Sequence, residues 1–133
     1  MKRILTVTLS AMLALSGCAP TTDKAAAVAT DFLSEFFNMN YAGAAALCSD
    51  DIAAMLRDTI ASDAYPSEEI RAKVIEASKN TTFKILSSEV DEESGEVVIN
   101  YEISPWGAVG NTAIPRTMRL GRIDGDWRVI ALE

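Results

Sequence analysis

The chain has 133 residues, with 12 basic and 19 acidic side chains, a formal net charge of −7 and no histidine. This length predicts a single domain, and the lack of histidine excludes Ser–His–Asp triads, Cys–His dyads and imidazole-bound metal sites. The acidic excess argues against nucleic acid as a partner, because binding to the phosphate backbone needs clustered Lys and Arg. A hydrophobic content of 49% is too high for a disordered chain.

Residues 1–18 read MKRILTVTLSAMLALSGC, in which a basic start precedes an apolar stretch from Ile4 to Leu15. That stretch is shorter than the ~20 residues that cross a bilayer, so it is typical of a secretory signal peptide rather than a membrane-spanning helix. Its end, Leu-Ser-Gly-Cys at 15–18, resembles the lipobox of bacterial lipoproteins.

The lipobox resemblance implies that residues 1–17 form a cleaved lipoprotein signal peptide and that the thiol of Cys18 is acylated, so that membrane lipid is a partner of the mature chain. Residues 18–24 then form a lipidated tether, and residues 25–133 form the domain. Ala19 follows the cysteine, in place of the aspartate that retains many such proteins in the inner membrane. The expected location is therefore the cell envelope, at the outer membrane and facing the periplasm if the source is Gram-negative. The alternative is an ordinary cleaved signal peptide that leaves Cys18 unmodified.

Amphipathic helices are predicted in the first half of the domain. Apolar side chains recur there every three or four residues, as Val28, Phe32 and Phe36 do. In the last of these segments Ile70, Val74 and Ala77 are expected to form the buried side. The predicted helices cover residues 24–38, 40–48, 49–60 and 66–80.

Cys48 follows a run of small apolar residues, Ala44 to Leu47, and is interpreted as a buried thiol that packs as a small hydrophobic side chain. The alternative is a redox-active or nucleophilic thiol. That alternative needs a nearby positive charge to lower the pKa, whereas Asp50 and Asp51 are close in the sequence.

The second half of the domain alternates apolar and polar residues, which predicts β-strands. Gly95 ends a polar turn between the first two strands, and Asp124-Gly125 is a tight hairpin signal between the last two. Helices followed by an antiparallel meander indicate an α+β fold, with the N-terminal helices packed on a four-stranded antiparallel sheet. The predicted strands cover residues 83–90, 97–104, 112–123 and 127–132.

Three segments carry a resemblance to a known fold: Ala29-Thr30-Asp31-Phe32-Leu33, Asn40-Tyr41-Ala42-Gly43-Ala44-Ala45 and Asp124-Gly125-Asp126-Trp127-Arg128-Val129. Their order resembles the NTF2-like (cystatin-like) cone superfamily, and most closely the bacterial lipoproteins of the DUF4878 type. The resemblance covers nearly all of residues 24–133. It implies a curved sheet wrapped around the first helix, with a cavity at the open end of the cone.

Two aromatic residues are the candidate ligand-binding residues. Tyr101 shares strand parity with Val97 and Ile99, so it is expected to point into the cone, and Trp106 lies in a loop that is expected to rim its mouth. The alternative for Trp106 is that it closes the end of the core. Trp127 has the parity of a core residue.

The charged residues of the strands allow two interpretations. Arg116, Arg119, Arg122 and Arg128 could grip an anionic group, or they could pair across strands with the acidic residues of the other half of the sheet on its solvated face. The acidic run 91–93 lacks the ligand spacing of a calcium loop. No catalytic motif, metal site or cofactor is predicted.

The sequence thus predicts a membrane-anchored envelope protein with a non-enzymatic domain that binds a small apolar ligand or an envelope protein. Two alternatives stay open. One is an NTF2-like enzyme that uses a cavity carboxylate and Tyr101 for acid–base chemistry. The other is a structural accessory without a ligand.

Overall fold

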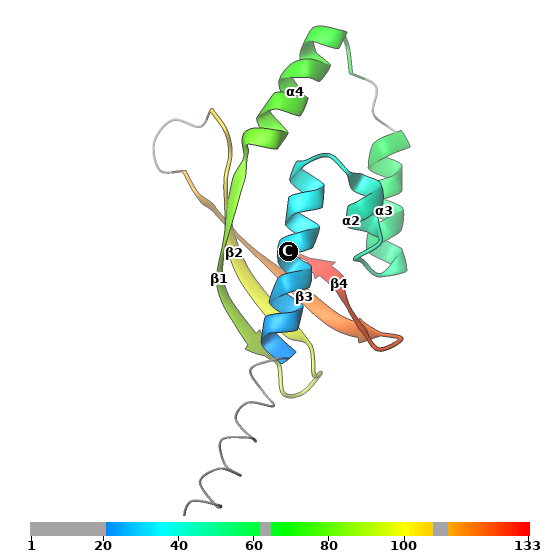
Figure 1. Cartoon of the computed structure of the whole chain (residues 1–133), viewed down its shortest axis with the longest axis vertical. Helices are drawn as coiled ribbons and strands as arrows, with labels where there is room; N and C mark the ends of the chain where they lie inside the picture. Colours follow the sequence, from blue (N-terminus) through cyan, green and yellow to red (C-terminus); the bar gives the residue numbers. More distant parts are fainter. Residues whose placement is uncertain (1–20, 62–64, 108–111) are drawn as a thin grey trace, which may run out of the picture.

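A computed structural model of the chain describes residues 21–61, 65–107 and 112–133 (Figure 1). Cys18 and the predicted signal peptide lie outside the described residues. The described part has the predicted α+β composition, with helices followed by one sheet. Residues 21–37 are helical, which includes the end of the predicted tether. The other elements are α2 (Tyr41–Ala45), α3 (Asp50–Ala61), α4 (Glu68–Asn80), β1 (Thr82–Val90), β2 (Val97–Ser104), β3 (Ile114–Ile123) and β4 (Asp126–Leu132).

The helices start where short polar side chains can accept backbone N–H groups. Asn40 precedes α2 and accepts a hydrogen bond from the backbone of Gly43 at 3.2 Å, and Ser67 does the same for Ile70 at the start of α4. Pro66 lies one residue before this cap, and Glu68 and Glu69 are in the first turn of α4, where the helix dipole favours negative charge.

The sheet is an antiparallel meander in the order β1-β2-β3-β4, as predicted. Its turns use left-handed backbone conformations at the predicted positions. Gly95 has a φ of 75°, and in the last hairpin Asp124 has 54° and Gly125 has 86°. Pro115 pairs with Glu102 of β2, but the pairing of β3 with β4 begins only at Met118. The proline therefore removes no donor from a ladder on the β4 side.

Alternate residues of the strands divide the sheet into two faces. Val97 and Ile99 of β2 lie opposite Leu120 and Met118 of β3, and all four are fully buried. The other face is polar, because Asn100 donates a hydrogen bond to Ser87 and accepts one from Thr117. The buried residues form one hydrophobic cluster that draws on the helix of residues 21–37, on α2 and α3, and on β2, β3 and β4.

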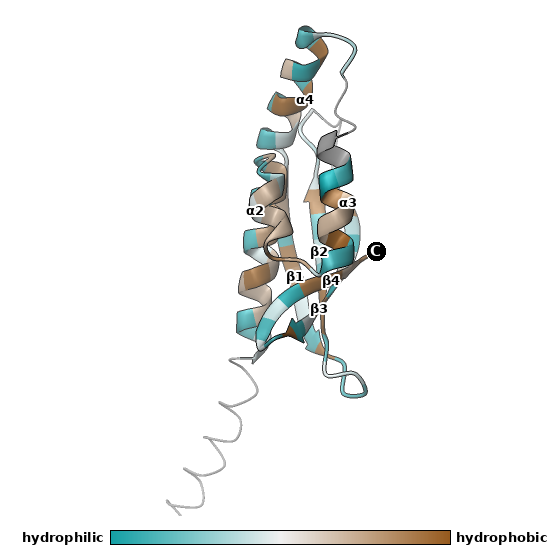
Figure 2. Cartoon of the chain, turned by 90° about the vertical axis from the view of Figure 1, so that its right-hand side faces the viewer, coloured by the Kyte–Doolittle hydropathy of each residue, from teal (hydrophilic) through white to brown (hydrophobic). Residues whose placement is uncertain are grey.

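The prediction that α4 has a buried side is wrong. None of its residues is buried, and Ile70 and Val74 are 42% and 36% exposed. Figures 1 and 2 show why: α4 stands beyond the end of the sheet instead of lying across it, with bands of hydrophobic and hydrophilic residues along its length. Its last turn is held by the Ser78 hydroxyl, which donates a 2.8 Å hydrogen bond to the carbonyl of Phe37.

Across the residues that the structure describes, no helix has the length and apolar character of a membrane span.

Candidate functional site

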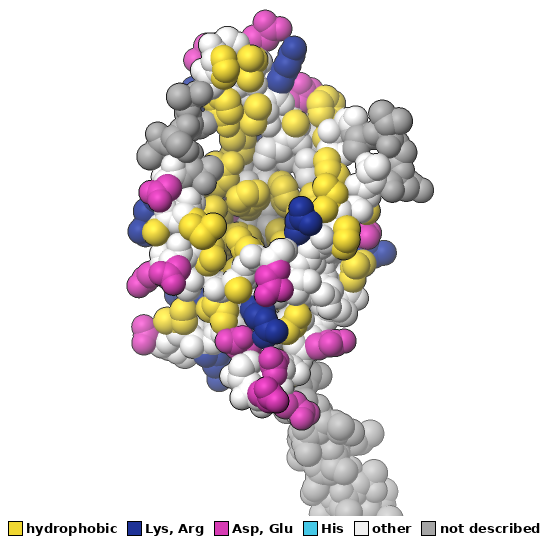
Figure 3. Space-filling view, turned by 180° about the vertical axis from the view of Figure 1, so that it is seen from behind, with side chains coloured by type: hydrophobic (Ala, Val, Ile, Leu, Met, Phe, Trp, Pro, Cys, Tyr) yellow, Lys and Arg dark blue, Asp and Glu magenta, His cyan; other side chains and the backbone are white. Residues whose placement is uncertain are grey.

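An apolar cavity of about 260 Å³ lies where the end of the N-terminal helix meets the sheet. In the view from behind, hydrophobic side chains gather around a hollow in the middle of the molecule, with a basic side chain at its edge (Figure 3). The polar side chains of the cavity wall come from strands β2 and β3 and from the last residue of the chain. The lining residues are Phe32, Leu33, Phe36, Phe37, Tyr101, Ile103, Arg116, Leu132 and Glu133.

The helical wall of the cavity follows from sequence spacing. Phe32 and Phe36 are four residues apart, as are Leu33 and Phe37, so the two pairs lie side by side on one face of the helix. The rings of Phe36 and Phe37 meet edge to face at 5.3 Å between centroids. Phe37 also stacks on Phe83 of β1 at 6.2 Å. These contacts hold the rings at the helix end, and the wall they form is apolar.

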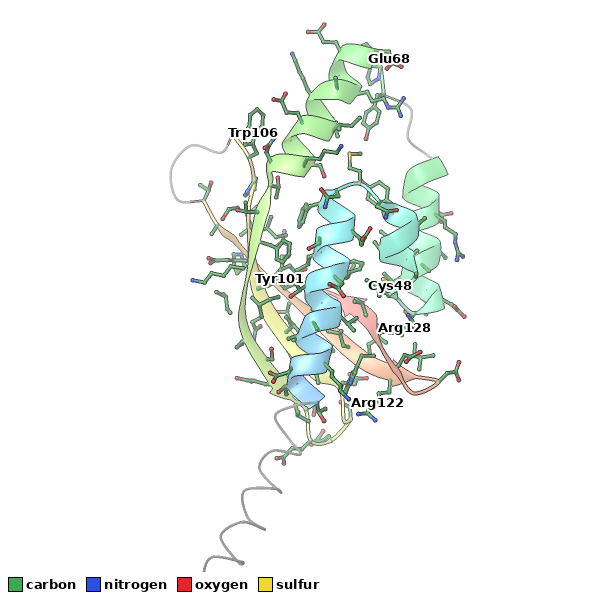
Figure 4. The ribbon with its side chains drawn as sticks, in the orientation of Figure 1. Cys48, Glu68, Tyr101, Trp106, Arg122 and Arg128 are labelled. Carbon is green, nitrogen blue, oxygen red and sulfur yellow. The ribbon has the colours of Figure 1, made fainter. Side chains whose placement is uncertain are left out.

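Tyr101 lines this cavity from β2, in agreement with the inward orientation that its parity predicts. Only 5% of the residue is exposed, and in Figure 4 it lies between the sheet and the N-terminal helix. Burial raises the pKa of its phenol, and the positive charge of Arg116 opposes this shift more weakly. The phenol is therefore neutral at ordinary pH and carries a hydroxyl that can donate a hydrogen bond.

Arg116 is the residue directly opposite Tyr101 on β3. It has the parity of Met118 and Leu120, which places it on the apolar face of the sheet. Its guanidinium Nη1 donates a 3.1 Å hydrogen bond to the carbonyl of Pro115. No carboxylate among residues 21–61, 65–107 and 112–133 lies within ion-pair distance of Arg116.

Trp106, the second candidate ligand-binding residue, does not line the cavity that contains Tyr101. It lies beyond the end of β2, near the end of α4 (Figure 4), and its backbone N–H donates to the hydroxyl of Thr81 at 3.3 Å. The alternative in which Trp106 closes the core is wrong, because the residue is 51% exposed. Trp127 is buried as predicted, at 8% exposed.

The other three strand arginines are each engaged elsewhere. Arg119 faces Asp91 at 3.2 Å and Glu96 at 3.3 Å, which is the cross-strand pairing that one interpretation predicted. Arg122 lies over the ring of Trp127, with 5.0 Å between the guanidinium carbon and the ring centroid. Arg128 donates to the carbonyl of Ala46 and lies 3.6 Å from Asp126. The four arginines therefore do not form a common anion site.

Cys48 is a buried thiol, as its neighbours in the sequence predicted. Its Sγ donates a 3.2 Å hydrogen bond to the carbonyl of Ala44. Burial raises the pKa of this thiol from 9.0 to about 12, although Arg128 partly opposes the shift. The thiol is thus protonated at neutral pH, which is the opposite of what a nucleophilic cysteine requires.

In the described part of the chain, no carboxylate is hydrogen-bonded to Tyr101. Glu133 is the one acidic residue in the lining, and its Oε1 lies 4.0 Å from Nε of Arg119. Glu35 accepts a hydrogen bond from the side chain of Asn40, and Asp31 is exposed on the polar side of the helix. Within the described part of the chain, no group of three Cys, Asp or Glu side chains is arranged to hold a metal ion.

Two features of the site were not predicted from the sequence. Arg116 was grouped with three other arginines, although its parity with Met118 and Leu120 separates it from Arg119. Phe37 at the end of the helix, which lines the cavity, was not singled out from the sequence. The alternation of residues along the strand could have separated Arg116 from Arg119. The position of the helix end relative to the sheet could not be predicted from the neighbouring sequence.

Comparisons of the chain with known protein families, with curated proteins and with solved structures found no significant match.

Proposed function

We propose that this chain is a lipid-anchored protein of the cell envelope whose domain binds a small apolar ligand in the cavity beside Tyr101. The anchor rests on residues 1–18, whose basic start, short apolar stretch and terminal Leu-Ser-Gly-Cys resemble a lipoprotein signal. Several acyl chains on Cys18 would hold the chain at a membrane stably, whereas one chain alone binds only marginally.

We further propose that the domain is an NTF2-like cone of the DUF4878 type, with its helices packed on the concave face of the sheet. The support is the composition of the core, in which Ala29 and Phe32 of the N-terminal helix belong to the same buried cluster as Ile99, Met118 and Val129 of the strands. In such a cone the ligand enters at the open end.

The single observation that carries the ligand-binding function is the apolar cavity of about 260 Å³. Ligand sites are concave and mostly apolar, with a few convergent polar groups. The lining has this character, with phenylalanines, Leu33, Ile103 and Leu132 around one phenol, one guanidinium and Glu133. A cavity favours a small ligand over a protein surface as the occupant, and over a structural accessory whose core is filled. Among the described residues, the one carboxylate residue of the lining, Glu133, lies beside Arg119 and is not hydrogen-bonded to Tyr101, which favours binding over acid–base catalysis.

Photocrosslinking on the full chain in a membrane tests this function. An octanol analogue with a diazirine in its tail should label peptides that contain Phe36–Phe37 and Tyr101–Ile103. Leu132→Trp adds bulk to a lining residue that is only partly buried, so it should reduce this labelling severalfold. Leu86→Trp is the matched control, because Leu86 is exposed and does not line the cavity.

Equal labelling of the chain and of both tryptophan variants, or labelling spread evenly over the surface, would contradict the binding function. The result does not depend on the anchor, since the labelled peptides belong to the domain.

A further inference from the structure

Two of the polar residues that line the cavity of the proposed ligand are direct partners in the sheet. Tyr101 and Arg116 are direct partners across β2 and β3, and both line the cavity. Opposite residues of antiparallel strands have Cα atoms about 4.5–5.5 Å apart and side chains on the same face. The phenol and the guanidinium are therefore available to the same group of one ligand.

Both polar groups have unused hydrogen-bonding capacity. Tyr101 is 95% buried by its 5% exposure, and its hydroxyl forms no hydrogen bond with any residue that the structure describes. Arg116 uses one hydrogen bond, to its neighbour Pro115, and leaves most of its N–H donors free. Among the described residues the one fully buried, unpaired side-chain polar atom is Nε1 of Trp127, so the hydroxyl of Tyr101 is accessible from the cavity that it lines and can donate a hydrogen bond to a ligand atom there.

The cavity wall contains one basic residue, Arg116, and one acidic residue, Glu133, in a chain that carries −7 overall. Glu133 is the one acidic lining residue, and its backbone pairs with Thr117, which belongs to the polar face of the sheet. Its carboxylate accordingly lies beside Arg119, at 4.0 Å, and not beside Arg116. Among the described residues, the guanidinium of Arg116 therefore has no carboxylate within ion-pair distance, although Glu133 lines the same cavity.

We propose that the ligand is an anionic amphiphile, with a short aliphatic tail among the phenylalanines and an acidic head group held by Arg116 and Tyr101. This inference rests on the proposed ligand-binding function. A guanidinium and a phenol both donate hydrogen bonds, and charge-assisted bonds of this kind select carboxylates and phosphates over alcohols and amines. The volume of about 260 Å³ lies below the ~300–1,000 Å³ of sites for larger ligands, so the cavity suits one short tail.

The test compares octanoate, octanol and octylammonium, each carrying the same photoreactive tail, on the full chain in a membrane. Octanoate should reach half-maximal labelling of the cavity peptides at about tenfold lower concentration than octanol, and octylammonium should label them least. Arg116→Gln should weaken octanoate labelling by about tenfold and leave octanol labelling within about twofold. Tyr101→Phe should weaken octanoate labelling by a smaller factor.

Lys84→Gln is the matched control, because it removes the same charge from an exposed residue of β1. Lys84 lies opposite Glu102 of β2 and does not line the cavity. It should leave the labelling by all three analogues unchanged. Arg116 is exposed and makes one backbone contact, so circular dichroism should show that Arg116→Gln is folded.

Each other outcome overturns one or both of the two proposals. Equal labelling by octanol and octanoate, with Arg116→Gln without effect, overturns the anionic ligand and leaves the binding function in place. A preference for octanoate that survives Arg116→Gln overturns the assignment of the head-group site. No cavity labelling by any analogue overturns the binding function itself, and the anionic ligand with it.

Discussion

Tyr101 and Arg116 face each other across β2 and β3, and both line the hydrophobic cavity, to which they contribute a hydrogen-bond donor and a positive charge. Neighbouring pairs in the same ladder, Ile99 with Met118 and Val97 with Leu120, are fully buried and apolar. The change from apolar pairs to a polar pair occurs along one continuous register. Along these two strands, the hydrophobic core therefore gives way to the candidate site over a distance of two residues.

Lipid attachment gives the first prediction. Metabolic labelling with radioactive palmitate should mark the wild-type chain and should fail to mark Cys18→Ala, because the lipobox resemblance makes the thiol of Cys18 the acylated atom. Cys48→Ala is the matched control and should retain the label, since that thiol is buried and protonated. Palmitate incorporation into Cys18→Ala, or its absence from the wild type, would show that the anchor is not formed as proposed.

Alkaline pH should destabilise the domain through Cys48. The pKa of its thiol is raised from 9.0 to about 12 in the folded state, so between these values the unfolded chain binds fewer protons than the folded one. The free energy of unfolding then falls as pH rises from about 9. Urea denaturation at a series of pH values should show this fall, and Cys48→Ala should make it shallower. Tyr101, whose pKa is also raised, accounts for a remaining slope with the same sign. Identical slopes for wild type and Cys48→Ala would refute the assignment.

The ion pair between Arg119 and Asp91 predicts that the pKa of Asp91 depends on Arg119. The guanidinium of Arg119 donates to this carboxylate at 3.2 Å and lowers its pKa below the usual 3.8. Arg119→Gln should raise the pKa of Asp91, as measured by carboxyl carbon chemical shifts in NMR titrations. Arg122→Gln removes the same charge from a residue that lies over Trp127, and it should leave Asp91 unchanged. Since a lowered carboxyl pKa stabilises the fold only above that pKa, the contribution is lost as the pH falls through it.

The core and α4 should respond differently to the loss of apolar groups. Leu120 is fully buried, so Leu120→Ala should lower the free energy of unfolding by about 2–5 kcal/mol. Val74 is 36% exposed on α4, and Val74→Ala should change the free energy by less than about 0.5 kcal/mol. Chemical denaturation of both variants and of the wild type measures these two changes in the free energy of unfolding. A large loss in Val74→Ala would mean that α4 has a buried face after all.

The elements with strong local signals were predicted well. The strands follow from alternation, and the last hairpin follows from Asp124-Gly125, which have the positive φ angles that such a turn requires. Cys48 and Trp127 were expected to be buried and are. In each case the deciding interaction lies within a few residues of the chain, so the sequence pattern carries the information.

The failures involve residues whose surroundings come from distant parts of the chain. Val74 has the spacing of a buried residue, but amphipathic spacing indicates a face without showing that another element covers it. Trp106, which one interpretation placed in the core, is instead 51% exposed, and its backbone N–H donates to Thr81, 25 positions earlier. The separation of Arg116 from Arg119 needed the register of β3 against β2.

The amino-acid sequence by itself determined the helix and strand periods, the turns, and the side of β2 on which Tyr101 lies, because these depend on backbone sterics and on the alternation of side chains. Only the tertiary structure decided that Tyr101 meets Arg116, that four residues of one helix close the cavity above them, and that α4 is left uncovered. The reason is physical. Side-chain spacing specifies a face on each element, whereas a cavity depends on how faces from separate elements meet without filling the space between them.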